Sequence, residues 1–320
     1  MDTKKRNNEF DIAKAMGIFL VILGHMPSMV PKSIRIWIFS FHMPLFYFIA
    51  GYFARDIKNG LELRQFIKRK WKGLIIPYII YSCLFLFLDI VSGRVGSNQI
   101  ISEIESILLG AQGVQWFLYG LFVVSLLFAI ARLIKPKKIR GCFVIGCILL
   151  GCMLHFWGIE NRFQLASSLY GVGFYYLGFL KRDKVQYDMK KALIFLIVSV
   201  VGVGILSRQY SVGILDMKVN AHIDILMNYL LALCSIYVIL YISHIIKSSN
   251  FASIFLKYIG KNSLYFFALT WYIPGILGDI FPKQSFVLKI ENYIVAFLFS
   301  WLCVEFKNKF EHVRDRKKLK

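Results

Sequence analysis

Long apolar runs recur along the whole chain and are separated by short polar segments. Most of these runs are as long as the stretch of about twenty residues that an α-helix needs to cross roughly 30 Å of hydrocarbon. We therefore predict an all-α, polytopic membrane helix bundle of about ten transmembrane helices. It is expected to form a single domain over residues 1–320, without a fused soluble domain. The predicted spans are residues 10–30, 34–53, 73–92, 116–134, 141–157, 165–180, 191–207, 222–246, 262–281 and 286–306.

Charge is distributed unevenly between the two ends of these spans. Counting Lys14 with the side of the N-terminus, 31 of the 39 Lys and Arg residues lie there and 8 lie on the other side. The 18 acidic residues divide into 10 and 8, so the whole net charge of +21 belongs to one face. The positive-inside rule makes that face cytoplasmic and places both termini inside the cell. Anionic lipid headgroups or an anionic cytosolic ligand explain this basicity better than nucleic acid does.

The first predicted span carries ionisable side chains at helical spacing. Lys14 and His25 are about three helical turns apart, so they share one helix face and lie about 16 Å apart along its axis. Ionisable groups are costly in hydrocarbon, so this stripe indicates a polar path from the membrane edge inward. Asp11 lies one turn before Lys14 and is expected to neutralise it. The pair is either a structural salt bridge or a means of aiming the Lys14 charge at an anionic ligand.

His42 in the second span is predicted to lie at the same depth as His25, because a short turn around Pro31 joins the two spans. Pro27 and Pro44, close to the two histidines, weaken backbone hydrogen bonding there. Irregular backbone at such depth usually lines a protein cavity. A histidine hydrogen-bonded across helices is the alternative, and it stays open for His42 in particular.

The segment between the second and third spans is strongly basic. Its spacing predicts a helix with an apolar face around Phe66 and with clustered cations elsewhere. Such a cluster is suited to phosphate groups, although contact with lipid headgroups alone would also explain it. The cations of this segment are Arg55, Lys58, Arg64, Lys68, Arg69, Lys70 and Lys72.

Three other features of the predicted spans and loops have simpler explanations. Trp116 and Tyr119 at the outer end of the fourth span belong either to an aromatic belt or to a site for a sugar ring. The apolar pattern at residues 100–108 predicts a short helix on the outer membrane surface. All 6 cysteines fall inside predicted spans and are expected to pack as apolar residues, without disulfides or a metal.

These motifs, in this order, resemble the acyltransferase-3 family of integral membrane O-acyltransferases, bacterial enzymes that modify exported sugars. The resemblance covers nearly the whole chain, and the first two spans are its most specific part. It is carried by Lys14 and His25 with ten residues between them, and by residues 41–51, 74–78, 116–118, 174–178 and 259–264.

The resemblance implies that an acyl group, acetyl by family frequency, passes from cytosolic acyl-CoA to a hydroxyl of a polysaccharide or lipid-linked sugar. It implies a location in the bacterial plasma membrane, in contact with membrane lipids, and no tightly bound cofactor. The family's histidine and its basic partner carry over to His25 and Lys14, with Asp11 and His42 as further catalytic candidates. The family's cytoplasmic Arg-x-x-Arg element corresponds to Arg69 and Lys72, with Lys68 and Arg64 beside them on the CoA phosphates.

The acceptor is expected to contact Trp116, Tyr119, Asn262 and Ser263. Two departures from the family pattern stand out. Lys72 replaces an arginine and lacks its bidentate fork. Thr270 and Trp271 stand where many relatives have a histidine.

Several functional alternatives remain open at this point. His25 acts either as general base or as a transient carrier of the acyl group. A proton- or anion-coupled transporter or flippase would use the stripe of Lys14 and His25 as a relay. Such a transporter would carry corresponding broken helices in two halves, and the sequence gives no sign of them. An inactive signalling or structural membrane protein is the other alternative.

Overall fold

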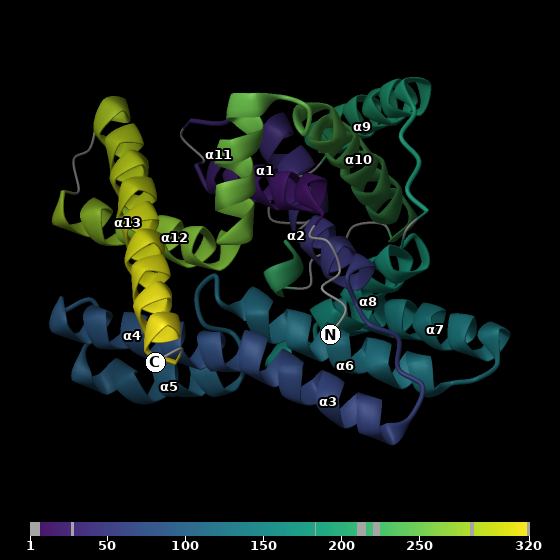
Figure 1. Ribbon diagram of the computed structural model, residues 1–320, viewed down its shortest axis with the longest axis horizontal. Helices are drawn as coiled ribbons and strands as arrows, with labels where there is room; N and C mark the ends of the chain where they lie inside the picture. Colours follow the sequence, from purple (N-terminus) through teal and green to yellow (C-terminus); the bar gives the residue numbers. More distant parts are fainter. Residues whose placement is uncertain are drawn as a thin grey trace. The chain divides into compact units, whose positions relative to one another are not determined.

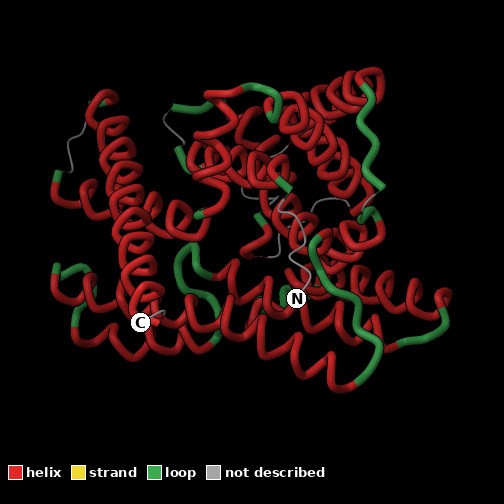
Figure 2. The backbone as a smooth tube through the Cα atoms, viewed as in Figure 1, coloured by secondary structure: helices red, strands yellow, loops and turns green. Residues whose placement is uncertain are grey.

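The computed structural model describes residues 7–26, 29–182, 184–209, 216–219, 225–281 and 285–318. Within these ranges every regular element is a helix, as Figure 2 shows. The predicted all-α class is therefore confirmed. A helix pairs its backbone N–H and C=O groups with one another, and this is needed in a membrane because hydrocarbon offers them no hydrogen bonds.

Seven helical stretches among the described residues are long and apolar enough to cross a membrane. They are Lys32–Tyr52, Gly60–Val91, Trp116–Leu133, Lys137–Phe156, Met189–Arg208, Leu226–Ile246 and Val287–Glu311. The other three predicted spans correspond to helices α1 (Asn8–Gly24), α8 (Leu165–Leu180) and α12 (Ser263–Ile280), of 17, 16 and 18 residues. These three helices are shorter or more polar than the seven stretches named above. The total of ten membrane spans therefore stays a prediction.

The chain groups into two compact units (Figure 1). Unit 1 consists of Met1–Val30 and Ile242–Lys320, and unit 2 of Pro31–Tyr241. Unit 1 contains α1, α11 (Asn250–Lys261), α12 and α13 (Phe286–Lys318). In it α1 packs on α11 and α12, and α12 packs on α13.

Close backbone contact holds α1 against α11 in unit 1. A Cβ atom on Gly260 of α11 would lie only 1.7 Å from the carbonyl oxygen of Asp11, so no larger residue fits there. α1 begins behind Asn7, whose side-chain oxygen accepts a hydrogen bond from the Glu9 amide. It ends at Gly24, earlier than the predicted limit of residue 30. The sequence places Pro27 shortly afterwards, and the residue before a proline avoids the helical conformation. Pro27 itself lies outside the described residues.

Unit 2 is organised around α8. Its other helices are α2 (Lys32–Tyr52), α3 (Gly60–Lys70), α4 (Ile76–Val91), α5 (Ile100–Leu108), α6 (Trp116–Leu133), α7 (Lys137–Phe156), α9 (Met189–Gln209) and most of α10 (Ile225–Ile246). α2, α6 and α7 all pack on α8. Two glycines bring α2 and α8 into backbone contact. A Cβ on Gly51 would lie 1.9 Å from the Tyr175 carbonyl oxygen, and one on Gly178 would lie 2.0 Å from that of Phe48.

The basic segment forms a helix, as its spacing predicts. α3 continues through a π-helical turn, η1 (Trp71–Ile75), directly into α4. Residues 100–108 form the predicted short helix, α5, which follows the 3-10 turn η2 (Ser97–Gln99). Two further 3-10 turns are η3 (Arg162–Gln164) and η5 (Met217–Val219).

Candidate active site

His25 caps the end of α1 and is held there by its own helix. Its backbone amide donates to the carbonyls of Val21 and Ile22, and its ring Nδ1 lies 2.8 Å from the Val21 carbonyl oxygen. A carbonyl only accepts hydrogen bonds, so Nδ1 carries a proton. In the neutral imidazole the lone pair therefore lies on Nε2, the nitrogen suited to take a proton from a substrate.

Trp271 of α12 packs against the His25 ring. The two ring centroids are 4.4 Å apart and the rings meet edge to face at 80°. Trp271 occupies the position where the family resemblance leads one to expect a histidine. The chain thus replaces a second imidazole near His25 by a large apolar ring. Thr270 beside it turns its buried hydroxyl back to the Phe266 carbonyl in the preceding turn.

Asp11 and Lys14 form the predicted ion pair near the start of α1. Their side-chain oxygen and nitrogen are 2.7 Å apart, and the two side chains are 7% and 24% exposed. Asp11 also meets the backbone of Gly260, which buries this turn of α1 against α11. The pair is therefore largely withdrawn from solvent, and removing one partner would leave a poorly solvated charge.

A second ionic cluster begins two residues earlier, at Glu9, and was not predicted from the sequence. The buried carboxylate of Glu9 is 3.2 Å from Nδ1 of His244 and 3.3 Å from the ammonium of Lys247. Glu9 stands next to the predicted span but has no spacing relation to Lys14 or His25. His244 and Lys247 lie more than 230 residues further along the chain, so only the tertiary structure of unit 1 brings them together with Glu9.

Asn262 and Ser263 form the joint between α11 and α12. The Asn262 side-chain amide donates to the Tyr258 backbone carbonyl at 3.0 Å. The backbone carbonyl of Asn262 accepts a hydrogen bond from the Tyr265 amide. Asn262 is buried and ends α11, while Ser263 begins α12. This geometry accounts for Asn262 structurally, and its contact with an acceptor stays a prediction.

His42 belongs to unit 2 and is fixed in the same manner as His25. It is buried in α2, with Nδ1 2.8 Å from the Ile38 carbonyl oxygen and its ring edge to face on Phe39. The predicted common depth of His42 and His25 concerns residues of the two different units and stays a prediction.

The four cations predicted to hold CoA phosphates point outward from the basic helix. Arg64, Lys68, Arg69 and Lys72 are all exposed. Lys70 differs from them, because its ammonium lies 5.5 Å from the ring centroids of both Phe66 and Tyr175. Tyr175 is fully buried, and its hydroxyl has no hydrogen-bond partner among the described residues. Lys70 is thus the cation of this segment that faces the interior of unit 2.

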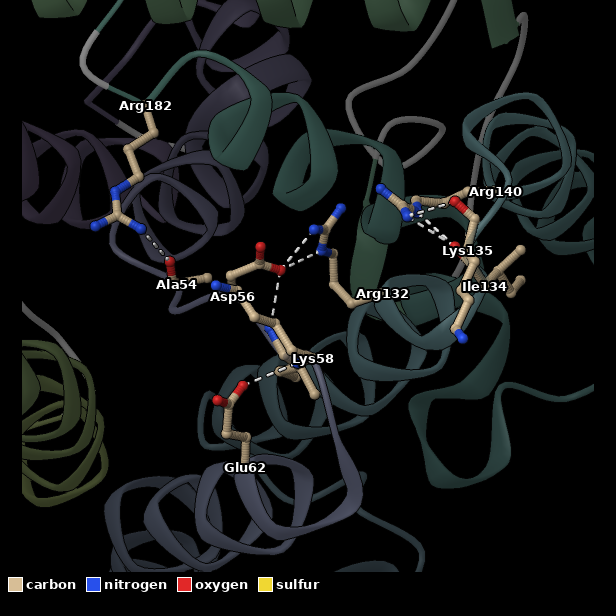
Figure 3. A network of polar contacts seen from close by, with 10 residues as sticks. Ala54, Asp56, Lys58, Glu62, Arg132, Ile134, Lys135, Arg140 and Arg182 are labelled. Atoms are coloured by element: carbon tan, nitrogen blue, oxygen red, sulfur yellow. Dashed lines mark hydrogen bonds and ion pairs between the residues drawn. The ribbon is translucent and has the colours of Figure 1, made fainter.

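A polar network ties the start of the basic segment to neighbouring helices (Figure 3). Asp56 forms an ion pair with Arg132 at the end of α6, with a closest approach of 2.5 Å. Arg182, just after α8, donates to the Ala54 carbonyl at 3.3 Å. The Arg132 guanidinium also lies 4.8 Å from the Phe179 ring centroid. These contacts join the segment before α3 to the ends of α6 and α8.

Trp116 and Tyr119 lie on α6 and have different surroundings. Tyr119 packs edge to face on Tyr78 and contacts Gly110, so it joins α6 to α4 and the outer loop. Trp116 is only 5% exposed and lies beside Gly120, so it faces the interior of unit 2. The hydroxyl of Tyr47 lies against the same glycine and has no hydrogen-bond partner among the described residues. Tyr47 is a further polar residue that its apolar sequence context had hidden.

The chain is similar to known proteins over most of its length. The model of a family described as an acyltransferase domain matches residues 7–304. Nodulation protein NolL of Mesorhizobium japonicum is 24% identical over 139 residues, which are 40% of this chain and 36% of that relative. The match thus spans little more than a third of the relative's own length. No solved structure gives a significant match.

Proposed function

Because the chain belongs to the acyltransferase family whose model it matches over residues 7–304, we propose that it acetylates a sugar hydroxyl. The donor is cytosolic acetyl-CoA, and the acceptor is a polysaccharide or lipid-linked sugar at the outer side of the cell membrane. The family and the long apolar helices together make the protein a membrane acyltransferase.

The observation that carries the proposal is the hydrogen bond between His25 Nδ1 and the Val21 carbonyl. It orients the ring and selects the tautomer with its lone pair on Nε2. Trp271 limits rotation of the ring from one side. A histidine oriented in this way suits a general base, because an imidazole ring can both accept and release a proton during one reaction.

The reaction needs few catalytic groups, because a thioester is already activated toward attack by a hydroxyl. The acceptor oxygen attacks the thioester carbon while His25 Nε2 takes the hydroxyl proton. The carbon–sulfur bond then breaks, the ester remains on the sugar, and the proton passes from His25 to the CoA sulfur. Unit 1 thus supplies the base, and its main further task is to exclude water that would compete with the sugar.

Each unit, taken by itself, offers cations that suit the anionic donor. In unit 1, Asp11 holds the Lys14 ammonium at 2.7 Å, so Lys14 is positioned before any ligand arrives. In unit 2, Arg64, Lys68, Arg69 and Lys72 offer an exposed basic surface to the CoA phosphates. Lys70, over the Tyr175 ring, provides a more enclosed cation on a tyrosine whose hydroxyl has no hydrogen-bond partner within the described part of the chain.

Trp116 and Tyr47 are the acceptor residues that we favour in unit 2. An aromatic ring suits the apolar face of a sugar, and the Tyr47 hydroxyl offers a hydrogen bond that none of the described residues uses. Tyr119 supports this region through Tyr78 and does not need to touch the sugar.

The test is transfer of label from acetyl-CoA by the full chain in membranes. Membranes that contain the protein should place acetyl label on an acceptor sugar, and His25→Ala should lower the rate by about 100-fold or more. His155→Ala at the end of α7 is the matched control, because it removes a membrane-helix histidine outside the proposed site. It should keep the wild-type rate.

Three outcomes separate the proposal from its alternatives. Equal rates for the wild-type protein and His25→Ala would remove His25 from the chemistry. Accumulation of unmodified acetyl-CoA or acetate across the membrane without labelled sugar would favour a transporter. Label that stays on the wild-type protein in the absence of acceptor, but not on His25→Ala, would show that His25 carries the acyl group.

A further inference from the structure

A groove of about 450 Å³ opens between α2 and α9 in unit 2. Ser33, Ile34 and Trp37 line it from α2, and Ser199, Val203 and Gly204 line it from α9. Both helices are long and apolar enough to cross a membrane. The groove is outside the sites discussed so far, and its volume lies in the range of ligand-binding clefts.

The walls of the groove are formed mainly by apolar side-chain atoms, although several polar groups lie in its floor. The Trp37 indole nitrogen donates to the Ser235 hydroxyl at 3.0 Å, and the Ser199 hydroxyl lies 3.2 Å from that of Ser235. The polar atoms of the floor are thus hydrogen-bonded to one another. What they leave for a ligand is apolar surface, and a hydrocarbon chain matches it.

The open side of the groove faces the bilayer. Val200, which lines the groove, is 63% exposed, and Ile197 and Val201 beside it on α9 are 61% and 55% exposed. Apolar residues this exposed on a membrane-spanning helix are in contact with lipid tails. A lipid chain can therefore enter the groove sideways from the membrane without crossing a polar barrier.

One end of the groove carries positive charge. Arg208 is exposed on α9 four residues after Gly204, so it lies on the same helix face, one turn beyond the groove. Lys32 belongs to the first turn of α2, beside Ser33 and Ile34, and is also exposed, while Arg35 in the same turn is half-buried. The charge distribution of the sequence assigns these ends of α2 and α9 to the outer side of the membrane. The two helices then cross in opposite directions, and their cations share one end of the groove.

We propose that this groove binds one hydrocarbon chain of an anionic lipid of the outer leaflet, with its phosphate at Arg208. The apolar walls select the chain, and the cations at the outer end select the negative headgroup. This inference goes beyond the proposed acyl transfer and does not depend on it.

Photo-crosslinking with a defined lipid tests the proposal. The full chain is placed in nanodiscs of phosphatidylcholine that contain a small fraction of phosphatidylglycerol with a diazirine at mid-chain. Illumination should label peptides of α2 and α9. The same diazirine on phosphatidylcholine should label these peptides about fivefold less, the factor that corresponds to about 1 kcal/mol for a basic residue near an anionic surface.

Two pairs of variants separate the groove from general lipid contact. A Cβ on Gly204 meets no atom within 4 Å, so Gly204→Trp fills the groove without a clash at its origin. Gly146→Trp on α7 is its matched control, because Gly146 has equally open space on another membrane-spanning helix. Arg208→Gln removes the charge at the groove, and Arg162→Gln removes one from a different outer loop.

Gly204→Trp should abolish most of the label on α2 and α9, and Gly146→Trp should leave it unchanged. Arg208→Gln should reduce labelling by phosphatidylglycerol to the level seen with phosphatidylcholine, whereas Arg162→Gln should not. Equal labelling by the two lipids in the wild-type protein would overturn the proposal. So would label that persists in Gly204→Trp, or crosslinks between α9 segments of two copies of the chain. If Gly204→Trp does not fold, the Arg208 and Arg162 pair still decides the matter.

Discussion

At the scale of single residues, His25 and His42 are oriented by the same kind of local hydrogen bond. In each, ring Nδ1 bonds to the carbonyl four residues earlier in the same helix, at 2.8 Å. The bond does not depend on contacts with other helices, and it fixes both the orientation of the ring and its tautomer. The sequence indicates His25 by its spacing to Lys14, and the carbonyl that orients each ring lies only one turn away in the same helix. The contact of His25 with Trp271 is different, since about 250 residues separate the two positions.

The ion pair of Asp11 and Lys14 is the residue-scale feature with the clearest energetic consequence. Asp11→Asn should leave the Lys14 ammonium without its counter-charge in a largely enclosed position. We expect it to lower the free energy of unfolding by about 1–3 kcal/mol. The double variant Asp11→Asn with Lys14→Met should lose less than the sum of the two single variants, because no charge is then left without a partner.

Denaturant or thermal unfolding of the four proteins in detergent measures this coupling. Lys307→Met, in an exposed pair with Glu311, is the control and should change stability little. Strictly additive effects of the Asp11 and Lys14 substitutions would show that the pair contributes no interaction energy.

At the scale of elements, the basic helix and the span that follows it show what a periodic pattern can and cannot predict. The four-residue spacing of Arg64, Lys68 and Lys72 predicts a helix, and α3 is one. Lys70 stands four residues after Phe66 in this helix, so a helical wheel places it on the apolar face, whereas the family's Arg-x-x-Arg element points to Arg69 and Lys72. The contact of Lys70 with Tyr175 of α8 joins residues far apart in the chain, and no helical wheel contains it.

Lys70 should therefore matter more for donor binding than its exposed neighbours on the same helix. We expect Lys70→Met to raise KM for acyl-CoA by about fivefold while kcat stays within about twofold, because a partly enclosed cation loses little to solvent screening. Steady-state transfer assays over a range of donor concentrations measure both constants. Lys58→Met, in the same segment but exposed, should leave both unchanged. A loss of kcat with unchanged KM would place Lys70 in the chemistry or the fold instead.

The contact between α2 and α8 depends on two glycines. Gly178→Ala would bring a methyl group to about 2.0 Å from the Phe48 carbonyl oxygen, so the helices must separate. We expect a loss of about 1–3 kcal/mol in the free energy of unfolding, as for other overpacked positions. Gly146→Ala is the control, because it adds the same methyl group in open space and should be neutral or stabilising by up to about 1 kcal/mol. Unfolding in detergent compares the two. Equal stability would mean that α2 and α8 separate without cost.

At the scale of the whole molecule, composition alone anticipates most of the architecture. The apolar runs predict the helical class, and seven of the ten predicted spans satisfy both length and hydropathy. The sequence could not predict which distant segments meet. The clusters of Glu9 with His244 and Lys247, and of Asp11 with Gly260, form only when the two ends of the chain pack together in unit 1. Local periodicity carries no information about such pairings.

The orientation in the membrane is a prediction at this scale and follows from the charge distribution. Since 31 of the 39 basic residues fall on one side of the predicted spans, the basic segment should face the cytoplasm and the loop before α5 the outside. Single cysteines introduced at Asn59 and Asn98, in a variant whose 6 native cysteines are replaced by alanine, test this with a membrane-impermeant maleimide. Asn98→Cys should react in intact cells, and Asn59→Cys only after permeabilisation. Labelling of both after permeabilisation controls for local burial. The reverse pattern would place Lys14 at the outer end of α1 and exclude the proposed entry of a cytosolic donor there.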